Sequence, residues 1–367
     1  MKWLDYPKIS LVLFAFIAAF VICEGHAKAD FTFGTPTNLG PTVNGSDDVV
    51  GVSISYDGLE LNFASNRPGG YGSYDLWLAT RPFTDYVWGE PVNLGPTVNS
   101  QCACVAPSIS SDGLQLYFSD WEYGPYLPGG IGVNDLWVLT RETTESAWSA
   151  PVHLGQPVNY TGGDMCPSIS ADGLSIYFAS GAARGGSGYY DLWVSMRPTK
   201  DNEWCTPLNL GPIVNSSASE ISPSLSSNSL TLFFCRTFTG QRDFDLWMTT
   251  RANEDDNWGM PVKLGSPVNS SDVEVFPSVS ADGSTLYFCS DRAGGFGLND
   301  LWQVSIIPIV DFNGDEIVDI KDLVILIEHW GTDSDLCDIG PPPFGDGIVD
   351  VKDLEVLMSY WHQKVLP

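Results

Sequence analysis

The sequence predicts an all-β five-bladed β-propeller followed by a small all-α domain, and two internal repeats support this division. An Asp-Leu-Trp step and an opening aromatic residue each recur five times, at intervals of 54 to 60 residues. The steps begin at Asp75, Asp135, Asp191, Asp245 and Asp300, and the aromatic residues are Phe33, Trp88, Trp148, Trp204 and Trp258. Because the five Asp residues occur once per unit, we expect them to hold the preceding loop by hydrogen bonds. One such unit cannot bury its own apolar face, so neighbouring units must stack. A different pattern occurs twice after residue 307.

Each repeat contains four short apolar or Ser-rich runs bounded by Gly, Pro, Asn and Asp, which is typical of strands. In the copy at 258–302 the runs lie at 260–264, 277–280, 286–289 and 300–304. The Ser-rich run suits the crowded position nearest a propeller axis. The first copy of the opening run has no blade of its own. We therefore expect residues 35–39 to pair with residues 301–306 and to close a ring of five four-stranded blades.

Residues 1–29 have the pattern of a secretory signal peptide. Lysines flank an apolar run at 9–22, and Ala27-Lys28-Ala29 supplies a small-x-small cleavage site. The run is shorter than the roughly 20 residues of a membrane span. We expect cleavage after Ala29, secretion of the chain from Asp30 onward, and no membrane association after cleavage. A retained membrane anchor is the alternative.

The chain is strongly acidic, with a net charge of −28. The signal segment holds three Lys against one Asp and one Glu, so its removal leaves −29. Such a surface argues against nucleic acid and anionic lipid as partners, and it suits a secreted protein that binds cations.

Seven cysteines follow the signal segment, an odd number that cannot pair completely within the chain. Cys235 and Cys289 end equivalent strands of neighbouring blades. Rotation about the ring axis turns their side chains away from each other, so we expect buried free thiols. Cys104 and Cys166 lie in adjacent loops and are candidates for a bridge.

One face of the ring is expected to collect carboxylates and guanidinium groups around the channel mouth. The acids are Asp164, Glu220 and Glu274, and the arginines are Arg67, Arg184 and Arg292. They are candidates for a polar-ligand pocket or a metal site. The alternative is a set of structural Arg-to-acid ties that hold Gly-rich loops. The acids occupy one repeat position, whereas a reaction centre breaks fivefold symmetry, so we expect no catalytic residues. If the protein is an enzyme, these three acids are the candidates.

An insertion at 120–128 interrupts the second repeat and carries Trp121, Tyr123 and Tyr126. Aromatic faces stack on sugar rings, so these residues are candidates for carbohydrate binding. A local hydrophobic cap on the second blade is the alternative.

The pattern that starts at residue 311 has the spacing of an EF-hand calcium loop. Its oxygen ligands are Asp311, Asn313, Asp315, the carbonyl of Ile317, Asp319 and Asp322. Three positions depart from that pattern: Glu316 replaces the usual Gly, position 9 is an Asp, and Asp322 replaces a Glu. The helix expected at 320–330 is amphipathic.

The second copy, at 345–354, keeps only the later part of such a loop. Asp346, the carbonyl of Ile348, Asp350 and Asp353 remain. Asp338 or backbone carbonyls must complete the ligand shell, and the alternative is a loop that binds weakly. Pro342 and Phe344 stand where the first oxygens are expected. The sequence therefore predicts one well-formed Ca²⁺ site and a second, degenerate one.

The Ser-Ala-Asp-Gly sequences at 170–173 and 280–283, their variants in the other units and the five Asp-Leu-Trp steps resemble TolB-like, WD-type β-propeller repeats. The paired loop-helix pattern resembles a type I dockerin. These resemblances divide the chain into residues 1–29, a propeller at 30–308 and a dockerin at 309–367. The second one implies calcium-dependent binding to a cohesin-bearing scaffold or surface protein. It places partner contacts at Ile320, Lys321, Val351 and Lys352, which are nearly the same in both halves and so permit two docking orientations.

Three functions follow from these expectations. In the first, the propeller is a binding or interaction module that the dockerin tethers to an extracellular assembly for polysaccharide breakdown. In the second, the propeller is a glycoside hydrolase. In the third, the protein is a structural component of a surface assembly.

Overall fold

The computed structural model describes residues 31–121, 127–238, 243–315, 317–332, 334, 336–340, 345 and 348–362. The expected signal peptide at 1–29, as well as Tyr123, Tyr126 and Asp346, lies outside these residues. Within the described ranges, no helix has the length and apolar character needed to cross a membrane.

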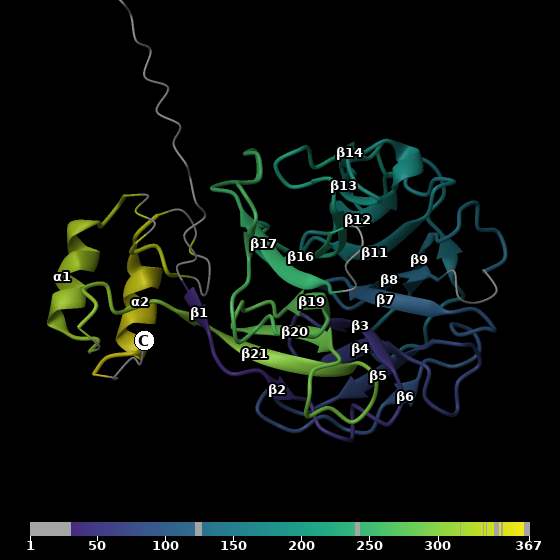
Figure 1. Ribbon diagram of the computed structural model, residues 1–367, viewed down its shortest axis with the longest axis horizontal. Helices are drawn as coiled ribbons and strands as arrows, with labels where there is room; N and C mark the ends of the chain where they lie inside the picture. The colour runs from purple at the N-terminus through teal and green to yellow at the C-terminus, as the bar shows by residue number, and fades with distance from the viewer. Residues whose placement is uncertain are drawn as a thin grey trace, which may run out of the picture.

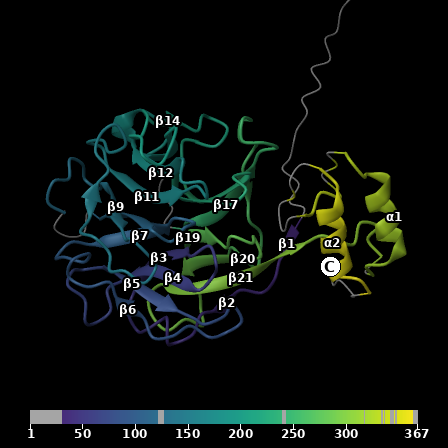
Figure 2. The ribbon, with the colours of Figure 1, turned by 180° about the vertical axis from the view of Figure 1, so that it is seen from behind.

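The fold is a ring of five antiparallel sheets, as Figures 1 and 2 show. Blade 1 consists of β3 (Val49–Ile54), β4 (Glu60–Ser65), β5 (Asp75–Thr80) and β6 (Val92–Asn93). Blade 2 consists of β7 (Cys104–Ile109), β8 (Gln115–Asp120), β9 (Leu136–Thr140) and β10 (Val152–His153). Blade 3 consists of β11 (Asp164–Ile169), β12 (Ser175–Gly181), β13 (Tyr190–Met196) and β14 (Leu208–Asn209), with a 3-10 turn at Ala182–Arg184. Blade 4 consists of β15 (Ser219–Leu225), β16 (Thr231–Thr237), β17 (Asp245–Thr250) and β18 (Val262–Lys263).

Blade 5 joins the two ends of the propeller and confirms the predicted ring closure. It consists of β19 (Glu274–Val279), β20 (Thr285–Ser290) and β21 (Asp300–Pro308), completed by β2 (Thr37–Asn38). Thr37 is opposite Gln303 and Asn38 is opposite Trp302. The sequence analysis did not anticipate β1 (Phe31–Phe33), which also pairs with the far end of β21. Two segments therefore cover an edge that would otherwise be open to pairing with another chain.

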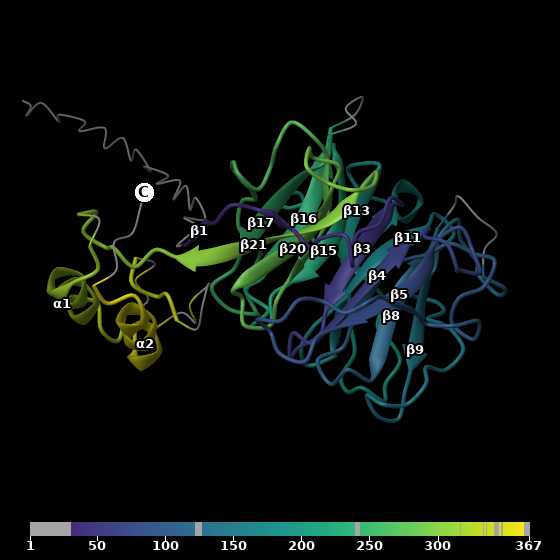
Figure 3. The same cartoon turned by 90° about the horizontal axis from the view of Figure 1, so that it is seen from below.

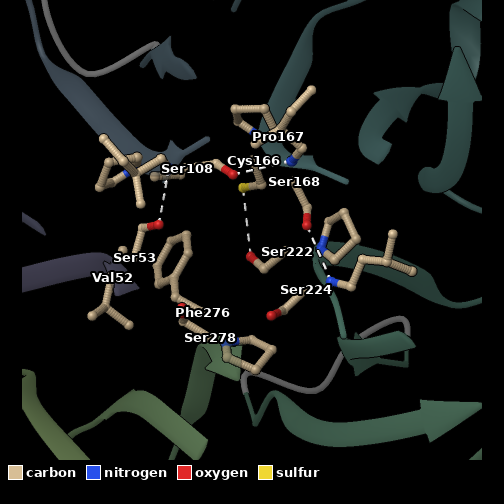
Figure 4. A pocket seen from close by; sticks show the side chains of 18 of the residues that line it. Val52, Ser53, Ser108, Cys166, Pro167, Ser168, Ser222, Ser224, Phe276 and Ser278 are labelled. Atoms are coloured by element: carbon tan, nitrogen blue, oxygen red, sulfur yellow. Dashed lines mark hydrogen bonds between the residues drawn. The ribbon is translucent and has the colours of Figure 1, made fainter. Parts of the chain in front are cut away.

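The innermost strands, β3, β7, β11, β15 and β19, surround the axis and carry the Ser-rich runs, as predicted (Figure 4). A serine of one blade accepts a hydrogen bond from a backbone N–H of the next blade. These bonds run from Ile109 to Ser53 (3.0 Å), Ile169 to Ser108 (3.1 Å), Leu225 to Ser168 (3.1 Å) and Val279 to Ser224 (3.2 Å). Small hydroxyl side chains thus let the strands approach closely and also link them.

Each innermost strand has a register shift at a residue with positive φ. These residues are Gly51, Ala106, Cys166, Ser222 and Phe276, with φ between 51° and 67°. A β-bulge of this kind bends a strand and re-aims its side chains. Because it recurs in every blade, it belongs to the architecture of the ring.

Aromatic side chains of the second strands fill the junctions between blades. Phe63, Phe118, Phe178, Phe234 and Phe288 are fully buried. Burying one such side chain stabilises a fold by about 1.5–3 kcal/mol. Cys235 and Cys289 directly follow Phe234 and Phe288 in the second strands of blades 4 and 5. Both are buried free thiols, as expected. The bridge considered between Cys104 and Cys166 is absent, because both are buried free thiols as well.

Beyond β21 the chain forms two short helices, α1 (Ile320–Glu328) and α2 (Val351–Ser359), which lie to one side of the ring (Figure 3). Asp319 and Asp350 cap their N-termini, and the side chains of Asp322 and Asp353 accept hydrogen bonds from the backbone N–H groups of these capping residues. Both helices pack on one small core. Its buried residues are Val310, Val318, Leu326, Cys337, Ile339, Val349, Val356 and Leu357.

Candidate functional site

The predicted acids lie on the upper face, which is the face that carries the loops between second and third strands. Each acid is fully buried and forms an ion pair within its own blade. Asp164 pairs with Arg184 at 2.9 Å, Glu220 with Arg236 at 2.8 Å and Glu274 with Arg292 at 2.9 Å. Burial raises the pKa of Asp164 and of Glu220, whereas their paired guanidinium groups act in the opposite direction. The ring therefore holds these acids in pairs rather than presenting them to solvent.

The predicted arginines also contact loop carbonyls and aromatic rings. Arg184 and Arg292 donate to the carbonyls of Val158 and Val268, and Arg67 donates to that of Val43. The guanidinium carbon of Arg67 lies 5.3 Å from the ring of Trp77. These are the contacts of the structural alternative, in which arginines fix the loops. Arg236, which the sequence analysis did not single out, plays the same part in blade 4.

The repeated Asp of the Asp-Leu-Trp step holds the adjacent loop, as the repeat implied. Asp75 accepts hydrogen bonds from the backbone N–H groups of Tyr71 (2.6 Å) and Gly72 (2.8 Å) and from Asn93 Nδ2 (2.7 Å). Asp191 and Asp300 make the corresponding contacts. These side chains are therefore structural.

The insertion in blade 2 is described only at its ends. The half-buried ring of Trp121 lies 5.5 Å from the ring of Tyr74 and packs against the apolar cluster between blades 1 and 2. Asp120 accepts from the backbone N–H groups of Leu127 (3.2 Å) and Asp135 (2.7 Å). Trp121 thus has the contacts of the local cap, while its predicted companions Tyr123 and Tyr126 lie outside the described residues.

The central channel encloses a cavity of about 100 Å³ lined by the innermost strands. Small-molecule sites usually measure about 300–1,000 Å³. In Figure 4 Phe276 and the serines of the inner ring surround this space, and Cys166 Sγ lies 3.5 Å from Ser222 Oγ. The channel at this level is too narrow for a sugar-sized ligand.

The first predicted calcium loop folds around its own carboxylates. Asp311 Oδ1 accepts from the N–H groups of Gly314 (2.8 Å) and Asp315 (3.2 Å). Asp322 is fully buried and accepts from Phe312 N (2.9 Å) and from Asn313 Nδ2 (3.0 Å).

The predicted ligands do not form a compact metal cluster in this geometry. In the part of the chain that the structure describes, no group of three or more His, Cys, Asp or Glu side chains is arranged to hold a metal ion. Instead, the ammonium group of Lys321 pairs with Asp315 and lowers the pKa of that carboxyl. One of the predicted Ca²⁺ ligands, Asp315, is thus paired with a lysine ammonium group.

The second loop repeats the backbone geometry of the first after 31 residues. Gly314 and Gly345 have φ values of 74° and 65°, and Gly331 and His362 have values of 77° and 61°. Gly331 N donates to the carbonyl of Val349 at 2.8 Å, and His362 N donates to that of Val318 at 2.9 Å. Each loop-helix half therefore donates one equivalent hydrogen bond to the other half, and the two halves form an approximate repeat.

The remaining predicted ligands and contacts are distributed over both halves. Asp353 is fully buried and accepts from the N–H groups of Ile339 (2.6 Å), Gly340 (2.7 Å) and Asp350 (2.6 Å), and burial raises its pKa. Asp338 lies against Gly345. The side chains of Ile317, Ile348, Ile320 and Val351 are 45–59% exposed. Lys321 and Lys352 are also exposed, and Asp319 is half-buried.

The sequence analysis missed two features of the lower face, which carries the turns between first and second strands. Asn228 Nδ2 donates to the carbonyl of Gly345 at 3.3 Å, so the turn of blade 4 contacts the C-terminal segment. The second feature is a cavity of about 350 Å³ between blades 1 and 2, lined in part by Glu60 and Arg141. A signal for the first feature was present, because Asn228 stands where the other four turns have Asp.

Comparisons with known proteins agree with the fold and give no family. No protein-family model and no curated protein sequence matches the chain. TolB from Acinetobacter baumannii is 14% identical over 71% of this chain and 54% of TolB, with a TM-score of 0.45. The chain thus spans about half the length of that protein.

Two glycosidase structures show a similar likeness. A thermostable family-43 glycoside hydrolase is 12% identical over 74% of this chain and 92% of that one, with a TM-score of 0.48. An α-L-arabinofuranosidase from Lactobacillus brevis is 13% identical over 72% and 90%, with a TM-score of 0.48. The chain is a five-bladed β-propeller distantly similar to these proteins. The likeness is one of fold alone.

Proposed function

We propose that the protein is a secreted, dockerin-bearing propeller, anchored through a calcium-dependent C-terminal module to a cohesin-bearing scaffold or surface protein. In this proposal the ring is a binding or interaction module in an assembly linked to polysaccharide breakdown. The observation that carries the proposal is the 31-residue repetition of loop, capped helix and cross-link, in which Gly331 and His362 occupy equivalent positions. Acidic loops that enter helices supply the carboxylate and carbonyl oxygens that Ca²⁺ takes as ligands, and this chain has two of them.

The residue types of the first loop fit Ca²⁺, although its described side chains are not gathered into a metal cluster in this structure. Calcium takes six to eight oxygens, and Asp311, Asn313, Asp315, the carbonyl of Ile317, Asp319 and Asp322 would provide them. In the second half, Asp338, Asp346, the carbonyl of Ile348, Asp350 and Asp353 would do so. Bound calcium would neutralise carboxylates that otherwise repel each other. The Lys321 ammonium, now on Asp315, would then be released toward the partner.

The exposed residues at the start of each helix support the docking surface. Ile320 is 59% exposed and Val351 is 53% exposed, and each is followed by a lysine. Apolar side chains ringed by charge are typical of a protein interface. We propose that Ile320, Lys321, Val351 and Lys352 contact the cohesin.

The glycoside hydrolase alternative receives no support from the positions of the acids. Asp164, Glu220 and Glu274 are each fully buried and ion-paired within one blade. A glycosidase needs two carboxyl groups that both reach the scissile bond. We therefore propose that these acids stabilise the blades.

Calcium titration of the full chain tests the anchor. We expect Ca²⁺ binding by calorimetry, and a loss of helical circular dichroism upon chelation. The double variant Asp311→Asn, Asp315→Asn should weaken Ca²⁺ binding at least tenfold. A matched control is Asp255→Asn, Asp256→Asn, which changes two exposed acids of the ring. Helices that remain equally ordered with and without calcium would contradict the proposal.

Partner binding is tested separately with a panel of recombinant cohesins. We expect capture in Ca²⁺ and release upon chelation. The double variant Ile320→Asp, Val351→Asp should abolish capture, whereas Val152→Asp, at an exposed position of the ring, should not. Capture that persists in the double variant would show that these residues are not the docking surface.

A further inference from the structure

The cavity on the lower face at the junction of blades 1 and 2 has the size of a small-molecule site. Its volume is about 350 Å³, within the usual range of about 300–1,000 Å³. Blade 1 contributes Asp57, Glu60 and Arg81, and blade 2 contributes Asp112 and Arg141. The next junction in the ring shows why a cavity exists here.

A tyrosine fills the equivalent space between blades 2 and 3. The Tyr117 side chain is 1% exposed, and its hydroxyl donates to Gln115 Oε1 at 2.9 Å. Arg197 Nη2 of blade 3 donates to the same hydroxyl at 3.5 Å. Tyr287 of blade 5 accepts from Arg81 of blade 1 in the same way, at 3.5 Å. Blades 2 and 5 thus each place a phenol against the guanidinium group of the following blade.

Blade 1 has Asn62 at the position of this tyrosine, and the junction is correspondingly less complete. Asn62 is 1% exposed, and neither of its amide atoms has a hydrogen-bond partner among the described residues. Arg141 Nη2 instead pairs with Glu60 Oε2 at 2.9 Å. Glu60 lies two residues before Asn62, on the same face of β4. The indole of Trp148, which stacks on Arg141 at 4.3 Å, is only half-buried. Its counterparts Trp88, Trp204 and Trp258 are 7–8% exposed.

The lysine bridge at the rim of the next junction has no counterpart at this cavity. In blade 3, Lys200 lies three residues after Arg197 and reaches back to Asp112 of blade 2, with Nζ 2.9 Å from Oδ2. The equivalent residue of blade 2 is Thr144, which is too short to reach Asp57 of blade 1 as a lysine does. Asp57 is exposed, and both of its hydrogen bonds among the described residues, from Ser55 Oγ and Leu59 N, end on Oδ1.

We propose that this cavity binds a neutral saccharide of one or two rings. Carboxylate oxygens at Asp57 and Glu60 would accept from sugar hydroxyls, and guanidinium groups at Arg81 and Arg141 would donate to sugar oxygens. Because groups of both charges line the cavity, a neutral ligand with many hydroxyls matches it better than a strongly charged one. Tyr56, 59% exposed at the rim, offers an aromatic face for a ring.

The proposal refines the proposed role of the ring as a binding module, and it rests on that role. It places the ligand on the lower face, away from the upper-face arginines and Trp121. The Glu60–Arg141 pair is held by surrounding contacts, since Arg141 Nε also donates to the carbonyl of Gly113 at 2.6 Å. The polar groups are therefore oriented before a ligand arrives.

Saturation-transfer NMR of the full chain provides the test. The probes are xylose, glucose and galactose and their β-1,4-linked dimers at about 10 mM, which detects dissociation constants in the millimolar range. We expect one saturable site for at least one probe. Thr144→Lys should build the missing bridge to Asp57, close the rim and weaken binding at least tenfold. The matched control Glu254→Lys places a lysine at the equivalent position of blade 4, away from the residues that line the cavity, and should leave the site intact.

Two outcomes would overturn the proposal. One is that none of the probes binds the unchanged chain. The other is that Thr144→Lys, correctly folded by circular dichroism, binds the probe as well as the unchanged chain does. Asn62→Tyr gives a second check, because a phenol at this position should both raise thermal stability and reduce binding. Failure of this test would leave calcium-dependent docking untouched, since that is measured on the C-terminal helices.

Discussion

Arg236 and Glu220 form an ion pair inside blade 4, with Nε 2.8 Å from Oε1 and the glutamate fully buried. Removing one partner of a buried pair costs about 3–5 kcal/mol, because the other charge is left without compensation. We expect Glu220→Gln to lower the free energy of unfolding by about this amount, measured by chemical denaturation. The exposed acid Glu254 gives the control Glu254→Gln, which should change little. Unchanged stability with a lost activity would instead point to a catalytic role for Glu220.

Removal of residues 31–38 should open the ring. This deletion exposes the edge of β21 at Trp302 and Gln303, which then offers unpaired backbone groups to other chains. We expect a lower melting temperature and concentration-dependent association by light scattering. Asn38→Ala keeps the closing strand but removes the bond that Asn38 donates to Asp300 (2.8 Å) and the bonds that it accepts from Gly40 N (2.8 Å) and Asn44 Nδ2 (2.9 Å). It should cost about 1–3 kcal/mol without association. A deletion variant that stays monomeric and equally stable would show that the closing strands are dispensable.

The turn of blade 4 is strained relative to the turns of the other blades. Ser229 has a φ of 61° at a position where Gly58, Gly113, Gly173 and Gly283 stand elsewhere. A residue with a Cβ in the left-handed region costs about 1–2 kcal/mol, partly offset by the greater freedom of Gly in the unfolded chain. We therefore expect Ser229→Gly to raise the melting temperature.

The reciprocal variant, Gly113→Ser, should destabilise the protein. Its new Cβ would lie 3.3 Å from Thr144 Cγ2, and the residue would keep a φ of 69°. Opposite shifts in melting temperature for these two variants would confirm the assignment. Equal shifts would contradict it.

Asp112 should stabilise the ring only above acidic pH. Burial acts to raise its pKa, but hydrogen bonds from Ser110 and Lys200 prevail and lower it from 3.8 to about 2. A depressed folded-state pKa means that the contribution is complete above about pH 4 and is lost as pH falls through 2. We expect Asp112→Asn to be less stable than the unchanged chain at pH 7, with a difference that shrinks as pH falls toward 2 and vanishes below it. A difference that is independent of pH would show that the charge of Asp112 is not involved.

Much of the fold could be read from local sequence. The five Asp-Leu-Trp steps gave the number of blades, and the unmatched first run predicted the pairing of residues 35–39 with β21, which the structure shows at Thr37 and Asn38. The repeat also indicated that Asp75 and its equivalents hold loops. Pattern suffices here because each blade is a local unit that contacts only its neighbours.

The contacts made by the candidate site residues could not be predicted from sequence patterns. The sequence placed acids and arginines on one face, but it left open whether they meet a ligand or each other. The structure brings Asp164 to Arg184 and Glu274 to Arg292 within single blades. Residues 20 and 18 positions apart are paired by strand register and loop path, which no periodicity specifies.

The sequence by itself determined the class of architecture: a ring of five similar units, the strand that closes it, and a twice-written acidic loop-helix pattern at the end. Only the tertiary structure decided which polar groups are satisfied and where space remains. Asn62 and Thr144 do not stand out in the sequence. At the junction of blades 1 and 2 they occupy the positions that Tyr117 and Lys200 occupy at the junction of blades 2 and 3. The reason is physical: strands follow from local periodicity, whereas a cavity depends on side chains of two blades that meet across a junction.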